Sequence, residues 1–513
     1  MLRVILVAVL LLLAGPVAAA ESVLHVRLNS DILSSEPGTL RDGNTDQVLL
    51  HVTEGLVAYR ENGTVAPLLA QGWTISPDGK TYTFALRAGI HFHNGQPMTS
   101  ADAVWSLKRW FGMGARWRCG DSIGPKGMTS VVDVTAPDAS TVVIRLDRPA
   151  PLFLTTLART DCGGTPIVSP ASADAGGKWI APIGTGPFMF GAWKRNQSID
   201  LVKFAGYSAL PGPRDGNTGG KTPLVDRVHF LIIPDSSAAV GALLRGNLDV
   251  LGEVAYVDYD TVRHNPDVTV NVTPMMDINT ILIQTRNPKL ADPRLRQAIA
   301  LTIDTEGMAR VITRGTARGN NSPVPRTSPF YGAAEAKLRG VDIVRAKQLA
   351  AAAGYRGEPI HLMTNHRYPE LFDQAVLLQA MAHKAGINIV IDTVDWATEV
   401  SKYSVGDYEL VSFSFGARLD PAFNFQLFIG DRVHEPRKVW NSPQAKAMLD
   451  TISATADPKA RQAQIDTLQA MFMDETPAIV TFNTSRLSAV RKNVVGYACW
   501  PTGLPRYWGV SLK

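Results

Sequence analysis

The sequence contains only three cysteines in 513 residues, which excludes the small disulfide-dense scaffolds. No Cys and His residues have the spacing of a zinc site, and there is no His-Glu-x-x-His helix. We also find no Gly-x-Ser-x-Gly elbow between a predicted strand and a predicted helix. These absences argue against an enzyme, so we expect no catalytic residues, no bound metal and no cofactor.

The basic residues are not gathered into a run, although the formal net charge is +5 and the pI is about 9.0. Scattered basic residues favour a solvated surface over a nucleic-acid site, so no nucleic-acid partner is expected. Hydrophobic residues make up 45% of the chain and charged residues 19%, as in ordinary soluble globular proteins. A chain of this length usually forms two or three domains.

Long apolar runs are also missing. The N-terminal run, Val4–Ala14, is shorter than the roughly 20 residues of a membrane-spanning helix, and no later run is long enough. Arg3 precedes this run and the small residues Ala18–Ala20 follow it, as in a secretory signal peptide. We therefore expect residues 1–20 to be removed and the mature chain to begin at Glu21. No cysteine follows the run to take a lipid, so a periplasmic protein without a lipid anchor is expected.

The most informative local pattern lies between residues 70 and 109. A Pro-Asp-Gly turn precedes Thr81–Arg87, where apolar and polar residues alternate as in a half-buried strand. A second short strand is expected over Ile90–His93. Thr99 and Asp102 have the spacing of a capping box, which predicts that a helix begins there.

This stretch resembles the signature of the large solute-binding proteins, family 5, that serve peptide and nickel ABC importers. Gly184-Thr185-Gly186-Pro187-Phe188 and the Asp-Pro helix start at Asp292 resemble the same family, and the resemblance covers nearly the whole mature chain. It implies an α/β fold, the two-lobed periplasmic binding protein of type II (large cluster) with an extra inserted domain. Such lobes close on a ligand.

The resemblance also implies how the chain is divided between the parts. Lobe I is expected to comprise residues 21–55, 185–275 and 482–513. The inserted domain II is expected over 56–184, and lobe III over 276–481.

Two expectations concern lobe III. Asp292 and Pro293 predict the start of an amphipathic helix, on whose outer face Arg294 and Arg296 should be solvated. Helical and extended segments alternate over residues 342–400, which indicates a largely parallel sheet with helices on its faces.

The three cysteines have different expected states. Cys119 and Cys162 lie on either side of a predicted hairpin, with strands Val131–Val134 and Val142–Leu146, and a disulfide between them is reasonable in an exported protein. The alternative is that both are simply buried. Cys499 is expected to be a buried, unreactive thiol.

The most informative ligand-facing stretch is Val411–Leu427. Peptide-binding relatives carry there a carboxylate that holds the peptide's α-ammonium group, but this chain has Ala417. Arg418 reverses the local charge, and its planar guanidinium suits a carboxylate or phosphate of the ligand. The alternative is that Arg418 pairs with Asp420 or points to solvent, while Asp420 itself is expected to cap the next helix.

Aromatic side chains are the remaining candidates for the cleft. Phe415, Trp396, Trp110 and Phe413 are the candidates to supply apolar contact area around the polar anchors, although a core position is the favoured alternative for each ring. His91 and His93 share one face of the expected strand as a metal pair would, but the family's turn explains His93 without a metal.

Taken together, the resemblance implies the substrate-binding component of an ABC importer, with a peptide-like or amino-acid-derived ligand and Arg418 favouring a carboxylate. Its partners would be the ligand and the transmembrane subunits of a permease, and a monomer is expected. The alternatives left open are a binding protein for a nickel chelate or oligosaccharide, a secreted hydrolase, and a module that serves a chemoreceptor.

Overall fold

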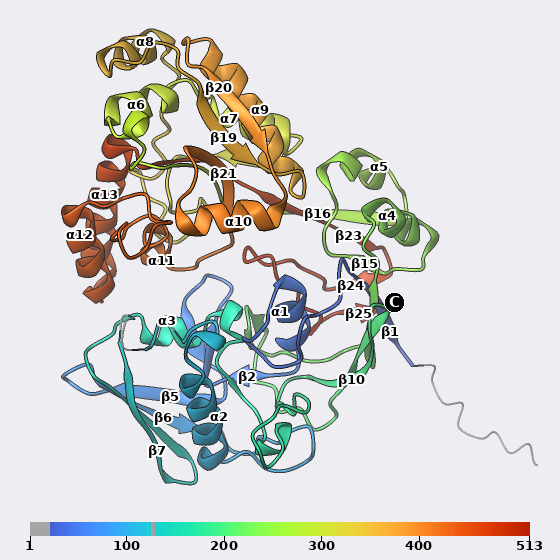
Figure 1. Ribbon diagram of the computed structural model, residues 1–513. Coiled ribbons are helices and arrows are strands. Elements are labelled where there is room, and N and C mark those ends of the chain that lie inside the picture. Colours follow the sequence, from blue (N-terminus) through green and yellow to red (C-terminus); the bar gives the residue numbers. More distant parts are fainter. Residues whose placement is uncertain (1–20, 121, 125–126, 128) are drawn as a thin grey trace, which may run out of the picture.

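The computed structural model describes residues 21–120, 122–124, 127 and 129–513, and the expected signal peptide lies outside these ranges. Three sheets organise the described residues into an upper part and a lower part, as Figure 1 shows. We propose to divide the chain by these sheets, with a seven-stranded sheet in lobe I, a four-stranded sheet in domain II and a six-stranded sheet in lobe III.

The seven-stranded sheet combines strands from distant parts of the sequence. Its core pairing is parallel, with Val26 opposite Phe230, and both side chains are fully buried. In spatial order its strands are β10 (Phe188–Lys194), β11 (Ser198–Lys203), β14 (Arg227–Ile232), β1 (Val23–Leu28), β15 (Val250–Leu251), β23 (Ser485–Arg491) and β16 (Val268–Pro274). The accompanying helices are α1 (Gly43–Leu49), α4 (Ser236–Arg245) and α5 (Tyr259–Arg263).

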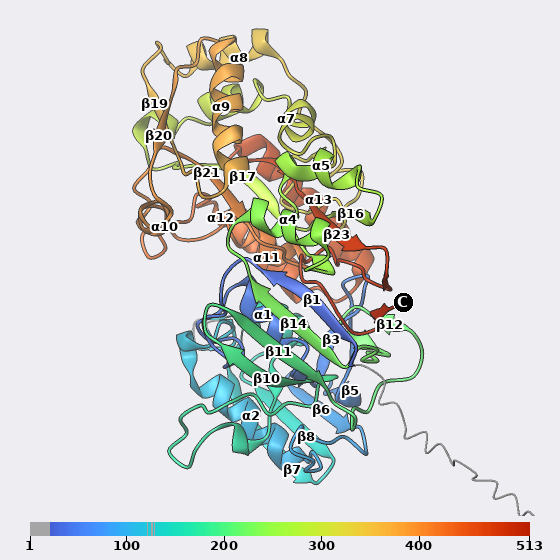
Figure 2. The same cartoon turned by 90° about the vertical axis from the view of Figure 1, so that its right-hand side faces the viewer.

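The four-stranded sheet is antiparallel and lies beside a long helix (Figure 2). Its order is β5 (Ala70–Ile75), β6 (Thr81–Leu86), β8 (Thr141–Leu146) and β7 (Val131–Asp138), with helices α2 (Ser100–Gly112) and α3 (Phe153–Leu157). The predicted alternation is confirmed in β6, where Tyr82, Phe84 and Leu86 are buried, and the predicted capping box begins α2. The strand expected over Ile90–His93 is wrong, because only a single bridge forms there.

The six-stranded sheet is mixed. The two strands within residues 342–400 are parallel, as predicted, but the expectation of a largely parallel sheet is wrong for the sheet as a whole. In spatial order it contains β18 (Arg318–Gly319), β22 (Ala478–Asn483), β17 (Ile278–Ile283), β21 (Leu410–Phe415), β19 (Ile360–Thr364) and β20 (Ile389–Thr393). Only the pairs that β19 forms with β20 and β21 are parallel. The chain enters this sheet through β17 and leaves through β22, and these strands run antiparallel to their neighbours.

Helices cover this sheet and extend below it. They are α6 (Pro293–Ala300), α7 (Thr305–Ile312), α8 (Ile343–Ala352), α9 (Pro369–His383), α10 (Trp396–Val405), α11 (Pro421–Phe425), α12 (Pro443–Ala454) and α13 (Pro458–Glu475). Short paired strands elsewhere are β2 (Glu54–Gly55) with β9 (Pro166–Ile167), β3 (Val57–Tyr59) with β4 (Val65–Pro67), β12 (Arg214–Asp215) with β13 (Thr218–Gly219), and β24 (Val494–Val495) with β25 (Ser511–Leu512).

The two arginines expected to be solvated on α6 have different environments. Arg294 is exposed and pairs with Asp292 at 2.6 Å. Arg296 is only 7% exposed, and its guanidinium donates to backbone carbonyl oxygens, including that of Thr476 at 2.9 Å. The expectation for Arg296 is therefore wrong: unpaired carbonyl groups near the end of α13 give this charge a buried site.

Two short connections join the seven-stranded and six-stranded sheets. One runs from β16 to β17 and the other from β22 to β23 through Thr484. The Asp277 carboxylate in the first connection accepts hydrogen bonds from the backbone N–H of Thr484 at 3.1 Å and from its hydroxyl at 2.8 Å. This arrangement is suited to a rigid-body hinge with few soft residues.

The structure joins Cys119 to Cys162 through a disulfide, with their Cα atoms 5.6 Å apart. The turn of the intervening hairpin lies at Ala139 and Ser140. Cys499 is a free, buried thiol, and burial raises its pKa.

Candidate functional site

The candidate site begins at one edge of the six-stranded sheet. Because β19 runs parallel to both β20 and β21, the carboxyl ends of these three strands share that edge. The loops that follow them contain residues 365–368, 394–395 and 416–420. Ligands of open α/β sheets bind outside the carboxyl ends of the strands. Figure 1 shows α10 and α11, which follow two of these loops, on the side of lobe III that faces α1 and α3.

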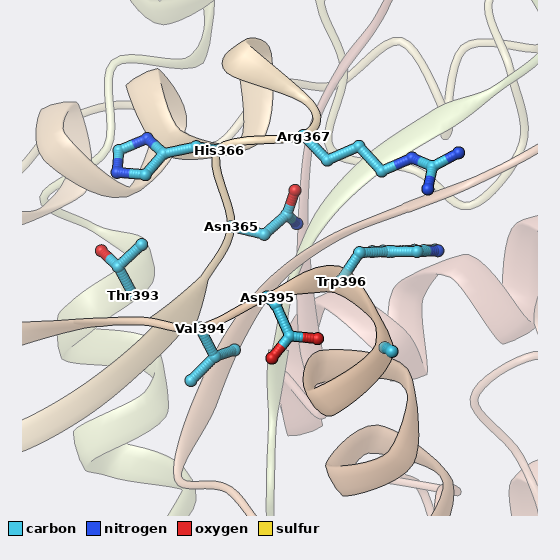
Figure 3. A pocket seen from close by; sticks show the side chains of 8 residues that line it. Asn365, His366, Arg367, Thr393, Val394, Asp395 and Trp396 are labelled. Atoms are coloured by element: carbon cyan, nitrogen blue, oxygen red, sulfur yellow. The ribbon is translucent and has the colours of Figure 1, made fainter.

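A cavity of about 640 Å³ lies between the first two loops (Figure 3). In Figure 3 the side chains of Arg367 and Trp396 extend in the same direction from the two facing loops. The residues that line the cavity are Asn365, His366, Arg367, Thr393, Val394, Asp395, Trp396 and Ala397. The cavity therefore combines one aromatic wall with groups of both charges.

Arg367 was missed by the sequence analysis. Its guanidinium carbon lies 5.8 Å from the centre of the Tyr368 ring, and no carboxylate of the described residues pairs with it. The available signal was positional, since this cation follows directly after a strand at the carboxyl edge of the sheet. An arginine held only over a ring is free to bind a ligand carboxylate.

Aromatic rings form a continuous group beneath the cavity. The Trp396 ring lies 5.0 Å from that of Tyr368 and is stacked on Phe413 at 5.8 Å, and Phe413 lies 5.1 Å from Phe415. Trp396 is partly exposed, whereas Phe413 and Phe415 are 7% and 8% exposed. Trp396 is thus the ring available to a ligand, and the two phenylalanines support it.

Trp110 lies elsewhere, and its expected place in the cleft is corrected. Its ring has no exposed surface, and its indole N–H donates to the Pro166 carbonyl oxygen at 2.7 Å in the core of domain II. A side chain without exposed surface has nothing to offer a ligand. Trp110 contributes to the stability of the domain.

Glu399 holds one of the loops that line the cavity in place. Its carboxylate accepts a hydrogen bond from the Asn365 side-chain amide at 2.9 Å, which ties the first turn of α10 to the loop after β19. The side chain is fully buried, and its Oε1 atom has no partner among the described residues. Burial raises the pKa of Glu399 to about 7, although the bond from Asn365 acts in the other direction.

Arg418 follows β21 and lacks a carboxylate partner among the described residues. Its Nη1 donates to the carbonyl oxygens of Gly416 at 3.2 Å and Ala417 at 3.0 Å. Asp420 pairs with Arg461 and caps α11 by accepting from the Ala422 N–H, so Arg418 does not pair with Asp420. Burial, opposed by the nearby Asp161, lowers the pKa of Arg418 to about 10.

Domain II lies against this loop from below. Arg159 donates to Asp161 at 3.0 and 2.8 Å, and its guanidinium carbon lies 5.4 Å from the centre of the Phe423 ring on α11. Arg118 also pairs with Asp161, at 3.5 Å. Although burial acts to raise it, the pKa of Asp161 is held well below its usual range by Arg159 and its hydrogen bonds.

Two sequence motifs do not form sites. His93 contacts the Gly186 carbonyl oxygen at 3.0 Å, burial lowers its pKa to about 4, and no group of three metal-ligating side chains occurs in the part of the chain that the structure describes. The letters Gly-x-Ser-x-Gly, which the sequence analysis overlooked, do occur at residues 120–124, but none of the described residues among them lies in a strand or a helix, and the Ser122 hydroxyl accepts a hydrogen bond from Arg159 at 3.4 Å.

Two α/β lobes joined by two short connections, with loops gathered at the carboxyl edge of a sheet, define the fold of a type II periplasmic binding protein. No helix of the described residues is long and apolar enough to cross a membrane. The model of the bacterial extracellular solute-binding proteins, family 5 (middle), matches residues 64–432, and the chain belongs to this family.

Relatives and solved structures agree with this assignment. The chain is 24% identical to the dipeptide-binding protein of Escherichia coli K12, over 93% of this chain and 91% of that one. It superposes on the DppA protein of Helicobacter pylori in complex with the peptide STSA with a TM-score of 0.79, at 24% identity, covering 96% of this chain and 98% of that one. For the AgaA protein of A. tumefaciens R10 in complex with agropinic acid the TM-score is 0.76, at 25% identity, covering 96% and 99%.

Proposed function

We propose that this protein is the substrate-binding component of an ABC importer and captures a peptide-like or amino-acid-derived ligand that carries a carboxylate. The ligand would lie between lobe III and the lower part of the molecule and contact both only when they close. Such a ligand shifts the population toward the closed form, which is then presented to the transmembrane subunits of the permease. We assign the protein a binding role and no catalytic one.

The observation that carries this proposal is the environment of Arg418. The chain has Ala417 where peptide-binding relatives hold an ammonium group, and the next residue offers a guanidinium without a carboxylate partner among the described residues. A charge-assisted, bidentate bond to a ligand carboxylate would compensate this cation. Trp396 and Arg367 supply an apolar face and a second cation near the cavity.

The printed names of two similar proteins support a peptide-like or amino-acid-derived ligand. One relative is named a dipeptide-binding protein, and another protein of the same fold was solved with agropinic acid. Nickel chelates and oligosaccharides remain the competing ligands.

We further propose that the chain is cleaved after Ala20 and that the mature protein is periplasmic, without a lipid anchor. The pattern of residues 1–20 supports this processing. We also propose that the protein is a monomer.

A thermal-shift screen tests the proposal. The mature chain is unfolded, refolded to remove carried ligand, and mixed with peptides, amino-acid conjugates, oligosaccharides and nickel chelates. A ligand at 100 times its dissociation constant adds about 2.7 kcal/mol of stability. Hits among carboxylate-bearing compounds support the proposal, whereas hits confined to oligosaccharides or chelates contradict it.

A further inference from the structure

Two loops of domain II lie close to the loop that carries Arg418, since Arg159 contacts the Phe423 ring on α11 and the charges of Arg118 and Asp161 act on Arg418. The Cys119–Cys162 disulfide joins these two loops. We call these residues, 114–120 and 159–164, the cystine loops. Both cysteines are fully buried. Arg118 and Asp161 each precede a disulfide-bonded cysteine by one residue, so the disulfide fixes the backbone from which both charged side chains extend.

Further contacts hold the cystine loops against the loop after β1. Trp117 donates from its indole N–H to the Cys162 carbonyl oxygen at 3.2 Å, and the Arg118 N–H donates to the Gly38 carbonyl oxygen at 2.9 Å. Gly38 has a φ of +72°, and a Cβ there would lie 2.5 Å from the Trp117 indole nitrogen. The charged groups of the cystine loops therefore extend from a rigid base.

Positive charges outnumber negative charges where the cystine loops approach Arg418. Asp161 is shared between Arg159 and Arg118, and Arg41 is paired with Asp46. Asp161 stabilises the charge of Arg418, but Arg159, Arg118 and Arg41 are close enough to oppose it. An anionic group between the lobes would offset this repulsion, because it would attract the arginines on both sides.

Arg118 is the arginine with room for such a group. Its side chain is 49% exposed, whereas that of Arg159 is 12% exposed and is engaged by Asp161 and the Phe423 ring. Arg118 contacts Asp161 through its Nε at 3.5 Å, and its terminal nitrogens donate no hydrogen bond to another described residue, so they can reach a ligand.

We propose that the disulfide positions Arg118 so that it shares the anionic group of the ligand, a carboxylate or a phosphate, with Arg418 of the opposite lobe. This inference rests on the proposed function, because it requires that Arg418 binds an acidic group. The disulfide acts as a positioning element, and Arg118 is a second residue that determines specificity for acidic ligands.

The experiment uses the refolded mature chain with inorganic phosphate and, separately, acetate, each compared with chloride at equal ionic strength. The thermal midpoint is followed against anion concentration to obtain an apparent dissociation constant. The variants are Arg418→Ala, Arg118→Gln, the pair Cys119→Ala/Cys162→Ala, and that pair combined with Arg118→Gln. Arg116→Gln is the matched control, because Arg116 is exposed on the same loop. The two anions distinguish a phosphate ligand from a carboxylate ligand.

The wild type and Arg116→Gln should bind one of the anions, and Arg418→Ala should lose this binding. Arg118→Gln and the cysteine pair should each weaken it about tenfold, and combining them should add little, since both remove the same interaction. If Arg418→Ala alone loses binding while Arg118→Gln and the cysteine pair bind normally, the inference is overturned and the proposed function stands. If the wild type does not respond, or Arg418→Ala responds equally, both fail. Should the cysteine pair not fold, Arg118→Gln decides the question.

Discussion

Arg461 donates two hydrogen bonds to the carboxylate of Asp420, from Nη1 at 2.7 Å and from Nη2 at 2.6 Å, and both side chains are less than a tenth exposed. This pair has a consequence two residues away. Because Asp420 is fully engaged by Arg461 and by the N–H of Ala422, it cannot neutralise Arg418. The buried pair thereby leaves the neighbouring cation available for a ligand.

Replacing Arg461 by Leu should therefore affect both stability and binding. The Asp420 carboxylate would be left buried without its partner, which costs about 3–5 kcal/mol. Affinity for acidic ligands should also fall, because Asp420 could then compete for Arg418. Urea unfolding measures the first effect, and Lys446→Ala, which removes an exposed pair with Asp450, is the control with a change within about 0.5 kcal/mol. A loss below about 1 kcal/mol for the Leu variant would argue against this role.

Truncation of Trp396 should mainly weaken ligand binding, whereas truncation of Trp110 should mainly lower the stability of the fold. Trp396 lines the cavity and is partly exposed, so Trp396→Ala should weaken binding of a ligand found in the screen by about 2 kcal/mol, roughly 30-fold, with a smaller loss of stability. Trp110 is fully buried, and Trp110→Ala should cost about 3–5 kcal/mol of stability. Calorimetric titration and denaturant unfolding separate the two effects. Unchanged affinity in the Trp396 variant would remove this ring from the site.

Glu399 should make stability depend on pH. Its pKa is about 4.5 in the unfolded chain and is raised to about 7 in the fold by burial, so the folded protein holds the proton more tightly. The resulting stabilisation is complete below pH 4.5 and is lost as the pH rises through 7. Glu399→Gln, which can still accept the bond from Asn365, should therefore gain up to about 3 kcal/mol on the wild type between pH 5 and pH 8. Parallel pH profiles for the two proteins would show that this carboxyl is not perturbed.

The disulfide should be the main covalent support of domain II. It closes a loop with a sequence separation of 43 residues, for which the chain-entropy model gives about 4 kcal/mol. The Cys119→Ala/Cys162→Ala pair should lose an amount of this order in denaturant unfolding. Thiol titration of the unfolded mature chain without reductant should find one free thiol, that of Cys499. A count of three would mean that no disulfide forms.

Local patterns in the sequence predicted the elements of the fold well. The alternation around Phe84 identified β6, and Thr99 with Asp102 identified the start of α2, because these signals depend only on neighbours in the chain. The mixed sheet of lobe III was not foreseen, since strand direction depends on how the chain crosses between lobes. The burial of Arg296 was also missed, because two of its partners, the carbonyl groups of Glu475 and Thr476, lie about 180 residues away.

The site was only partly predictable for the same reason. Arg418 and Trp396 were proposed from the resemblance to the family, which marks Val411–Leu427 as a ligand-facing stretch and includes Trp396, and their role in binding stays a prediction. Arg367 carries no motif, and only the parallel pairing of β19 with β20 places it beside Trp396. Trp110 is a large aromatic residue of a kind that often lines clefts, but it lies in a core that only tertiary packing defines.

We propose that the ligand binds to Arg418 through a carboxylate. The most direct measurement is calorimetric titration of the refolded wild type and of Arg418→Ala with the best peptide-like hit and with the same compound carrying an amide in place of its carboxylate. Arg294→Ala, which removes an exposed arginine of the same lobe, is the control. We expect the free acid to bind the wild type at least about tenfold more tightly than the amide, a difference of about 1.4 kcal/mol, and Arg418→Ala to abolish this preference. Equal affinities of the wild type for acid and amide, or an unchanged preference in Arg418→Ala, would contradict it.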